Sequence, residues 1–245
     1  MSFTLTVLGS SGTYAGAQGA CSGFLVRTDD TTVMLDAGPG TLGHLQQHVS
    51  LDSLDAVVLS HCHPDHWLEL PVMRNAFRYV LERRGIELYL TAETEKMAMS
   101  LCSGELEPTF SPHVITDRSQ FDIGSLHFTC SATDHPVETL AVRVDHDGRS
   151  IGYSSDTGPG WSLSWLGEGI DLAVVEATYV EGSPFASPVH LSARQAGEMA
   201  RAAGAARLAL THVLPESDVT ESVVEATAAY GSTVDVATVH RTFTI

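Results

Sequence analysis

The sequence has no long apolar run and no basic segment at its start. No stretch of its 245 residues approaches the roughly 18 uninterrupted apolar residues that a membrane-spanning helix requires. The first residues also lack the basic region and the small-residue cleavage site of a signal peptide. We therefore expect a cytoplasmic protein that neither spans a membrane nor is exported.

Cysteines and basic residues are both scarce. The four cysteines, Cys21, Cys62, Cys102 and Cys130, are scattered and form no CxxC pair, so we expect reduced and mostly buried thiols. Only 13 lysines and arginines stand against 30 aspartates and glutamates, which gives a formal net charge of −17. Such a surface repels phosphate backbones and offers no basic footprint, so it disfavours a long nucleic acid as a partner.

Neither a linker nor a low-complexity tract divides the chain, so a single domain over residues 1–245 is the simplest interpretation. Apolar periodicity predicts strands at Phe3–Leu8, Cys21–Arg27, Thr32–Asp36, Ala56–Ser60, Glu87–Leu90, Ser125–Ser131, Thr139–Asp145, Ser150–Ser154, Leu172–Glu176 and Arg207–Thr211. It predicts helices at Gly40–His48, Trp67–Glu82, Glu93–Leu101, Trp161–Leu166, Ser192–Ala203 and Ser217–Ala229. Because strands alternate with surface helices in both halves, we predict an α/β fold, an αββα sandwich with two mixed sheets and outer helices.

The densest group of chemically capable side chains is the segment His61-Cys62-His63-Pro64-Asp65-His66. Neutral imidazole is the commonest protein ligand for zinc, and carboxylate oxygen is a usual partner. His61 and His63 are two positions apart, so they can point the same way and bind one metal, while Asp65 and His66 can reach a second. A lone histidine more often packs or is solvated, but four ligand-type residues within six positions favour a metal site.

The remaining ligands must come from elsewhere in the chain. Three candidates, His135, Asp156 and His212, each follow a predicted strand. Taken singly, each could instead serve packing or form a turn. Their shared position at strand ends indicates ligands that rigid elements deliver to one edge of a sheet.

These residues carry a resemblance to the metallo-β-lactamase superfamily, whose HxHxDH signature is matched by residues 61–66. Further motifs occur in the order found in its ribonuclease Z-like branch: Asp134-His135-Pro136, Tyr153-Ser154-Ser155-Asp156-Thr157, Glu176-Ala177-Thr178, His190-Leu191-Ser192 and Leu210-Thr211-His212. One departure is Ser155, which stands where the family usually has glycine. The motif spacing in the second half is most similar to that of the small actinobacterial cyclic-nucleotide phosphodiesterases.

The resemblance implies two divalent metal ions, zinc in the first place, with Mn²⁺ or Fe²⁺ able to occupy the same ligands. By the resemblance, His61, His63 and His135 hold one ion, Asp65, His66 and His212 hold the other, and Asp156 bridges them. A bridging water would then act as hydroxide, with Asp65 to orient it and accept its proton. The remaining local charge of about +1 favours an anionic phosphoester.

The resemblance also assigns a role to His190, because a histidine at the matching motif protonates the leaving oxygen. A nearby acid orients that histidine in the family, and Glu176 matches this acid by position. From the residues alone, Ser192 is the expected N-cap of the following helix, so His190 could equally be an incidental loop residue.

Three kinds of protein remain open. The first is a phosphodiesterase that acts on cyclic nucleotides or other small phosphodiesters. The second is a tRNA 3′-end endonuclease, which would need a basic arm that the stretch from Gly158 to Val189 does not contain. The third is a lactone, thioester or β-lactam hydrolase, or a metal-binding module without catalysis. A serine hydrolase is disfavoured because the sequence has no GxSxG. The resemblance is compatible with a homodimer, although the sequence shows no interface.

Overall fold

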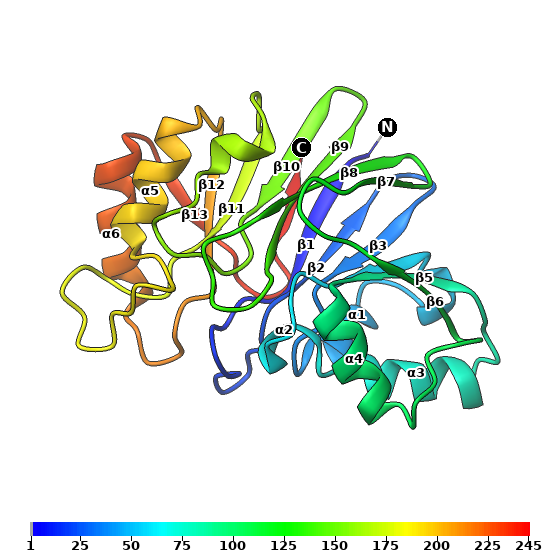
Figure 1. Ribbon diagram of the computed structural model, residues 1–245. Coiled ribbons are helices and arrows are strands. Elements are labelled where there is room, and N and C mark those ends of the chain that lie inside the picture. The colour runs from blue at the N-terminus through cyan, green and yellow to red at the C-terminus, as the bar shows by residue number, and fades with distance from the viewer. Residues whose placement is uncertain (1) are drawn as a thin grey trace.

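The structure is a computed structural model that describes residues 2–245. Two seven-stranded sheets pack face to face, and helices cover the outer face of each sheet (Figure 1). This arrangement confirms the predicted αββα sandwich with two mixed sheets. No helix within residues 2–245 has the length and apolar character needed to cross a membrane.

The first sheet has the order β14-β1-β2-β3-β4-β5-β6, antiparallel from β14 to β3 and parallel from β3 to β6. Its strands are β1 (Thr4–Gly9), β2 (Gly23–Arg27), β3 (Thr32–Leu35), β4 (Ala56–Val58), β5 (Ile86–Leu90), β6 (Phe110–Val114) and β14 (Thr242–Thr244). Because β3 to β6 are parallel, their carboxyl ends meet at one edge of the sheet.

The second sheet has the order β13-β12-β11-β10-β9-β8-β7, parallel from β13 to β10 and antiparallel from β10 to β7. Its strands are β7 (Gln120–Ile123), β8 (Leu126–Ala132), β9 (Leu140–His146), β10 (Arg149–Tyr153), β11 (Leu172–Glu176), β12 (Leu208–Thr211) and β13 (Val234–Val236). The two halves of the chain therefore repeat one plan, in which parallel strands end together.

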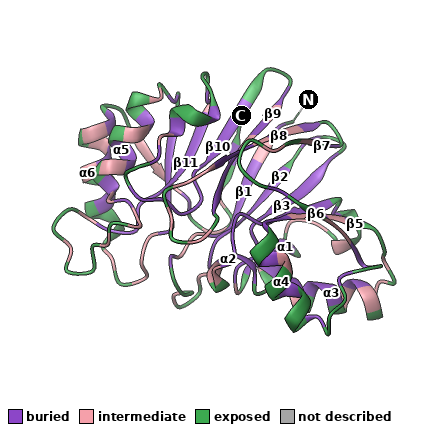
Figure 2. Ribbon diagram, in the orientation of Figure 1, coloured by how far each residue is buried: buried purple, intermediate pink, exposed green. Residues whose placement is uncertain are grey.

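The helices form the two outer layers. They are α1 (Thr41–Leu45), α2 (Pro64–Trp67), α3 (Leu70–Tyr79), α4 (Ala92–Leu101), α5 (Ala193–Ala202) and α6 (Val219–Tyr230), with 3-10 turns η1 (Leu51–Ser53) and η2 (Leu163–Leu166). Apolar residues of α1, α3 and α4 pack on the first sheet, and those of η2, α5 and α6 pack on the second. A third apolar cluster lies between the sheets. Buried residues accordingly fill the strands, while the helices expose their outer faces (Figure 2).

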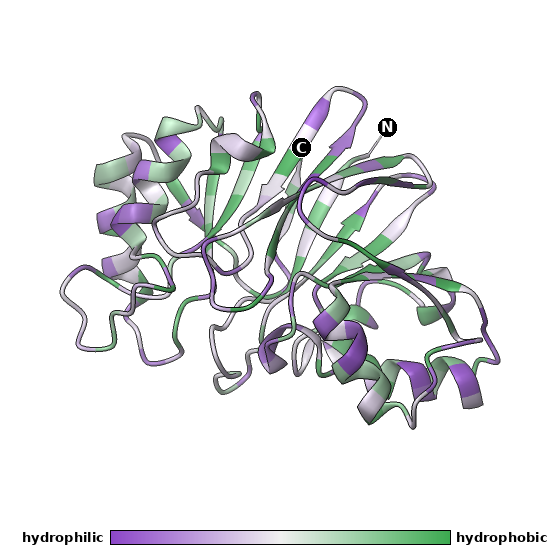
Figure 3. Ribbon diagram, viewed as in Figure 1, coloured by the Kyte–Doolittle hydropathy of each residue, from purple (hydrophilic) through white to green (hydrophobic). Residues whose placement is uncertain are grey.

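The strands that lead to the polar edge are covered on both faces. Every residue of β11 and of β12 is buried, and their sequences are nearly continuous apolar runs. This is the pattern expected of parallel strands with a sheet on one side and helices on the other. Figure 3 shows the same concentration of hydrophobic residues in the central strands. The residues that follow these strands are therefore held by rigid elements.

Several element boundaries differ from the prediction. The helix expected at Gly40–His48 is only α1, whose short span contains Gly43, a poor helix former. The helix expected at Trp67–Glu82 is α3, which runs only from Leu70 to Tyr79, and a separate short helix, α2, precedes it because Pro64 starts a helix at its first position. Strand β6 was not predicted. It is partly exposed at the edge of its sheet and contains Pro112, so it lacks a strand-like apolar alternation.

Candidate metal centre

All seven predicted metal ligands lie together where the strands of both sheets end. They follow β4 (His61 and His63), lie in α2 (Asp65 and His66), or follow β8, β10 and β12 (His135, Asp156 and His212). The position of α2 explains why the signature segment is compact. Pro64 opens this short helix directly after His63, so the chain turns and brings Asp65 and His66 back toward the strand end.

The seven predicted ligands form two groups, with Asp156 facing both, and a third overlapping group joins Asp156 and His212 to His190. One atom from each of His61, His63, His135 and Asp156 lies within 4.8 Å of the others, and the same is true of Asp65, His66 and His212. Asp156 Oδ2 is 3.7 Å from His61 Nε2. Its other oxygen, Oδ1, is 3.2 Å from His66 Nε2 and 3.4 Å from His212 Nε2. One carboxylate therefore faces both groups, one oxygen to each.

Three atoms at the centre of the cluster are buried without a hydrogen-bond partner: His61 Nε2, His66 Nε2 and Asp156 Oδ1. A buried polar atom left unpaired costs about 1–3 kcal/mol, so a folded protein rarely keeps three together. Metal ions bound between these atoms would satisfy all three. The residues present therefore fit a divalent metal site.

Protonation also suits metal binding in the first group. Burial lowers the pKa of His61 well below its usual value, and it lowers the pKa of His63 and of His135 as well. A lower pKa favours the neutral imidazole, which is the form that binds metals. These three side chains are therefore ready as ligands without first losing a proton.

The second group attracts positive charge. Although burial opposes it, the charges of Asp156 and Asp36 hold the pKa of His66 well above its usual value. Burial likewise opposes the ionisation of Asp156, yet His212 and His66 hold the pKa of that carboxyl well below its usual value. The negative charge of the buried carboxylates thus favours protonated histidines in this group. A bound metal cation would neutralise the same negative charge in place of those protons.

Asp36 is a part of the site that the sequence analysis did not identify. It follows β3, is fully buried and has a φ of +58°. Its Oδ2 accepts hydrogen bonds from His66 Nδ1 and Tyr153 Oη, both at 2.8 Å, and from Ser60 Oγ at 2.9 Å. A carboxylate on one ring nitrogen fixes the other nitrogen toward the ligand cluster. The available signal was the position of Asp36 at a strand end, which it shares with Asp156.

Glu176 is the last residue of β11, and its buried carboxylate joins two predicted site residues. Its Oε1 lies 3.0 Å from His190 Nδ1 and accepts the Thr157 N–H at 2.7 Å. Its Oε2 accepts the Thr178 hydroxyl at 2.6 Å, and the same hydroxyl oxygen lies 2.9 Å from His212 Nδ1. Glu176 therefore contacts His190 directly and His212 through the Thr178 hydroxyl.

His190 borders the ligand cluster in the loop before α5. Its ring stacks on that of His212 at 5.3 Å between centroids, and its Nδ1 is 4.0 Å from Asp156 Oδ2. Because Nδ1 faces Glu176, the free position of the ring is Nε2, which has no hydrogen-bond partner within residues 2–245. The side chain keeps 15% of its surface exposed, and His190 also lines a cavity.

The glycine-rich turn after β1 closes over the same cluster. The Thr13 N–H donates to Asp65 Oδ2 at 2.9 Å, so the backbone of this turn contacts a candidate ligand directly. A Cβ at Gly12 would lie only 2.6 Å from the His212 carbonyl oxygen. Glycine is therefore required at this position for the turn to approach the site.

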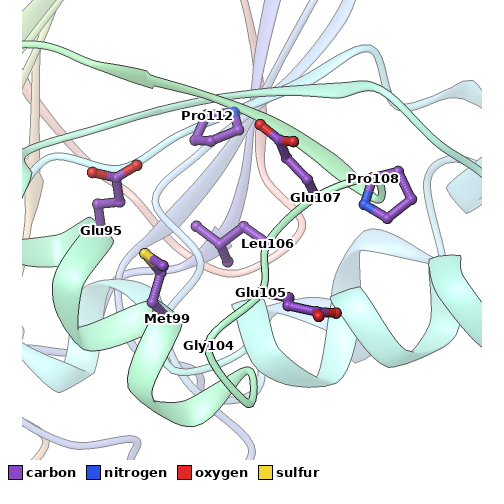
Figure 4. Close-up of a pocket in the computed structure, with 8 residues that line it drawn as sticks. All are labelled: Glu95, Met99, Gly104, Glu105, Leu106, Glu107, Pro108 and Pro112. Atoms are coloured by element: carbon purple, nitrogen blue, oxygen red, sulfur yellow. The ribbon is translucent and has the colours of Figure 1, made fainter.

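Two cavities differ in their relation to the cluster. The first, of about 410 Å³, includes His190 in its wall together with Tyr179, Glu181, Ala186, Pro188 and Arg194. We call it the His190 cavity. The second, of about 540 Å³, lies between α4 and the segment before β6 (Figure 4) and contains none of the candidate site residues. Its rim carries Glu95, Glu105 and Glu107, so it disfavours anionic ligands.

Known proteins resemble this chain over most of its length. Residues 31–213 match the family described as the β-lactamase superfamily domain. An uncharacterised protein of Mycobacterium tuberculosis is 32% identical over 255 residues, covering 100% of this chain and 93% of that protein. The probable metallo-hydrolase YhfI of Bacillus subtilis is 27% identical over 242 residues, with coverage of 95% and 96%. A protein named ribonuclease Z of Haloarcula marismortui is 25% identical over 269 residues, with coverage of 87% and 86%.

A solved structure shows the same fold. The crystal structure of the metallo-β-lactamase fold protein YhfI from Bacillus subtilis superimposes with a TM-score of 0.90 at 24% sequence identity. The similarity covers 99% of each chain. The agreement therefore extends over both sheets and all the elements that carry the ligand cluster.

Proposed function

Because this chain belongs to the metallo-β-lactamase superfamily and is a metal-dependent hydrolase, we propose that it is a dinuclear phosphodiesterase acting on cyclic nucleotides or other small phosphodiesters. The observation that carries the proposal is the pair formed by His190 and Glu176 beside the ligand cluster. An alkoxide leaving group needs a proton, and this pair is placed to supply one. Relatives named ribonuclease Z, which act on a phosphodiester, add support.

Under this proposal each group of ligands holds one divalent ion. His61, His63 and His135 would hold the first, Asp65, His66 and His212 would hold the second, and Asp156 would serve both. When bound, zinc or a similar ion supplies Lewis-acid stabilisation of the phosphoryl oxygens and an activated water. Asp36 keeps His66 in the required orientation through its Nδ1.

Asp65 is the proposed base. Its Oδ2 is fixed by the Thr13 N–H and lies 3.3 Å from His212 Nε2, so the carboxylate cannot rotate freely. Burial opposes its ionisation, but the hydrogen bond with His212 holds the pKa of Asp65 well below its usual value. The carboxylate is therefore charged at neutral pH and can orient the attacking water by accepting a hydrogen bond from it, while its role as proton acceptor would depend on bound metal ions lowering the pKa of that water.

His190 is the proposed acid. The contact with Glu176, at 3.0 Å, holds its Nδ1 and leaves Nε2 as the nitrogen that can face a leaving group. The proton on Nε2 can then pass to the leaving oxygen as the phosphorus–oxygen bond breaks. The neutral ring that remains keeps its Nδ1–H bond to Glu176, so its orientation is preserved for the next cycle.

The two other hydrolase classes have less support. A tRNA endonuclease would need cationic surface near the site, yet residues 158–189, which lie between Asp156 and His190, contain no lysine or arginine. The net charge of −17 adds long-range repulsion of a polynucleotide. A lactone hydrolase would use the same ligands, and no feature of the site favours it over a phosphodiesterase.

Substrate assays test the proposal directly. Purified protein with Zn²⁺ or Mn²⁺ should hydrolyse bis(p-nitrophenyl) phosphate and 3′,5′-cyclic AMP, but neither precursor tRNA nor a homoserine lactone at comparable efficiency. Asp65→Ala serves as the inactive control, and circular dichroism should show that it retains the fold. Lactone turnover without any phosphodiester turnover would overturn the proposal.

A further inference from the structure

We propose that the His190 cavity binds the leaving group of the phosphodiester and selects a neutral alcohol, such as a nucleoside, over one that carries another phosphate. The inference rests on the proposed function, because it takes His190 as the group that faces the leaving oxygen. It adds a substrate class that the metal ligands alone do not define, since those ligands contact only the phosphoryl group.

The cavity adjoins the ligand cluster at His190. His190 separates the cavity from the ligand cluster, with its ring stacked on His212 and its edge in the cavity wall. The wall is tied to the cluster a second time, because Val189 O lies 3.1 Å from Nδ1 of the candidate ligand His135. An oxygen that receives the proton of His190 Nε2 is therefore at the entrance of this cavity, and the group attached to that oxygen would continue into it.

The size and the nearer lining of the cavity suit a small uncharged molecule. Its volume of about 410 Å³ falls within the roughly 300–1,000 Å³ of typical small-molecule sites. Together with His190, the lining includes Tyr179, Pro159 and Pro188, and its uncharged polar residues are Ser187, Ser192 and Gln195. The Tyr179 ring lies 6.0 Å from the His190 ring and is only 9% exposed, so it forms a fixed wall. An aromatic ring and two prolines offer apolar contact to a sugar or a base.

The charged residues at the far end of the cavity leave no free cation. Arg194 is the basic residue of the lining, and it is paired on both sides, at 2.9 Å to Glu181 and at 3.1 Å to Glu198. One guanidinium against two carboxylates gives this end a net charge of −1. A second phosphate on the leaving group would therefore meet repulsion rather than an ion pair.

The amino end of α5 also borders the cavity, and most of its N–H groups are already paired. Ser192 Oγ accepts the Gln195 N–H at 3.2 Å, and Gln195 Oε1 accepts the Ser192 N–H at 2.8 Å, which forms a capping box. The Ala193 N–H donates to Tyr179 O at 2.7 Å. Because these three donors are already engaged, the helix end has few amides left to bind a phosphate.

A charge variant tests the selectivity. The substrates are a dinucleoside monophosphate and its analogue with a terminal phosphomonoester on the leaving nucleoside. We expect the wild-type protein to prefer the first, and Glu181→Gln with Glu198→Gln to reduce the ratio of kcat/KM by about two- to tenfold, a modest change because both carboxylates are exposed to solvent. Glu82→Gln with Glu168→Gln, both exposed and remote from the cavity, makes the same change in net charge and should leave the ratio unaltered.

A steric variant tests occupation of the cavity by an independent route. Ala186 is exposed and lines the cavity, so Ala186→Trp should fill part of it without disturbing the core. We expect kcat/KM to fall more for the dinucleoside monophosphate than for bis(p-nitrophenyl) phosphate, whose leaving group is smaller. Leu101→Trp, on the exposed end of α4, is the matched control.

The outcomes separate the two proposals. Equal losses on both substrates in Ala186→Trp, or an unchanged ratio in the charge variant, would overturn the assignment of the cavity while the phosphodiesterase stands. Absence of bis(p-nitrophenyl) phosphate turnover in the wild-type protein would instead overturn the proposed function.

Discussion

Glu176 Oε1 lies 3.0 Å from His190 Nδ1, while the other oxygen of the same carboxylate reaches His212 through the Thr178 hydroxyl. One buried side chain at the end of β11 therefore orients both the proposed acid and a proposed metal ligand. The loop before α5, which carries the proposed acid His190, and the loop after β12, which carries the proposed ligand His212, therefore pack around the same carboxylate.

Glu176→Gln should lower kcat for cyclic nucleotides by about 10- to 100-fold, the range seen when a group that orients a ligand or catalytic residue is changed. The amide oxygen can still accept one bond, but its nitrogen would face the Leu191 N–H and Thr178, which now donate to a carboxylate. Loss of these buried bonds should also lower the free energy of unfolding by about 1–3 kcal/mol. Steady-state kinetics and denaturant unfolding measure the two effects.

The exposed Glu168→Gln is the matched control for Glu176→Gln and should change neither quantity. A Glu176→Gln protein with wild-type kcat on cyclic nucleotides would show that the contact with His190 has no role in turnover.

His190→Ala should slow cyclic nucleotide hydrolysis by about 10²- to 10⁴-fold, the usual contribution of a general acid. The loss on bis(p-nitrophenyl) phosphate should be much smaller, since p-nitrophenolate leaves without protonation. The ratio of the two kcat/KM values, measured at equal metal occupancy, is the decisive quantity. Equal losses on both substrates would argue against proton donation and for a structural role.

Removal of metal should destabilise the protein. His61 Nε2, His66 Nε2 and Asp156 Oδ1 are buried without a well-formed hydrogen bond, and a bound cation would give each of them a ligand contact. A metal present at 100 times its dissociation constant adds about 2.7 kcal/mol to the free energy of unfolding. Thermal unfolding after chelation should therefore occur at a lower temperature, and Zn²⁺ or Mn²⁺ should restore it. Asp156→Ala should show a much smaller metal-dependent shift, and an equal shift in this variant would contradict its place among the ligands.

Asp36→Asn should weaken metal binding by about 10- to 100-fold, as expected for a group that orients a ligand. The Asp36 carboxylate accepts three bonds through Oδ2 alone, from His66, Tyr153 and Ser60, and an amide cannot reproduce that set. Competition with a fluorescent chelator measures the affinity. Asp52→Asn, on a partly exposed turn after α1, is a neutral control, and equal affinities in the two variants would remove Asp36 from the site.

The sequence was sufficient for the architecture because its strands are strongly marked. The apolar run at Leu172–Glu176 coincides with β11, and the two-sided burial of this strand explains why its pattern was clear. The ends of helices were less predictable where a single residue determines them. Pro64 turns the signature segment into the start of a helix, whereas periodicity placed the helix start at Trp67. Strand β6 had no usable pattern, because its residues alternate poorly in burial at an exposed edge.

The candidate ligands could be selected from the sequence because each follows a strand and belongs to a short motif. Their grouping around Asp156 required three dimensions, since the two sheets contribute residues far apart in the chain. Asp36 was missed because a single aspartate after a strand is a common turn former. Only its burial and its bond to His66 distinguish it. The His190 cavity likewise depends on loop conformation, which no periodicity encodes.

Ser155 offers a test of backbone strain beside the metal centre. It has a φ of +52° and is 1% exposed, and the corresponding position in the family is usually glycine. A left-handed conformation costs an L-residue roughly 1–2 kcal/mol, and replacement by glycine removes this cost. Glycine also makes the unfolded chain more flexible, which offsets part of the stabilisation. Ser155→Gly should therefore raise the free energy of unfolding by up to about 1 kcal/mol. Metal affinity should stay the same, because the Ser155 hydroxyl is a distant 3.5 Å from His61 Nδ1, whereas Ser60 Oγ lies at 3.0 Å.

Ser154→Gly is the comparison that separates backbone strain at Ser155 from loss of a serine hydroxyl. Ser154 Oγ accepts the Glu176 N–H at 2.9 Å and donates to the Ser155 carbonyl at 2.7 Å, so Ser154→Gly should destabilise the fold by about 1–3 kcal/mol. Opposite signs at adjacent buried serines would identify strain at Ser155, since loss of a hydroxyl alone would destabilise both. If Ser155→Gly also destabilised the protein, contacts of the Ser155 side chain would stabilise the fold by more than the left-handed backbone destabilises it.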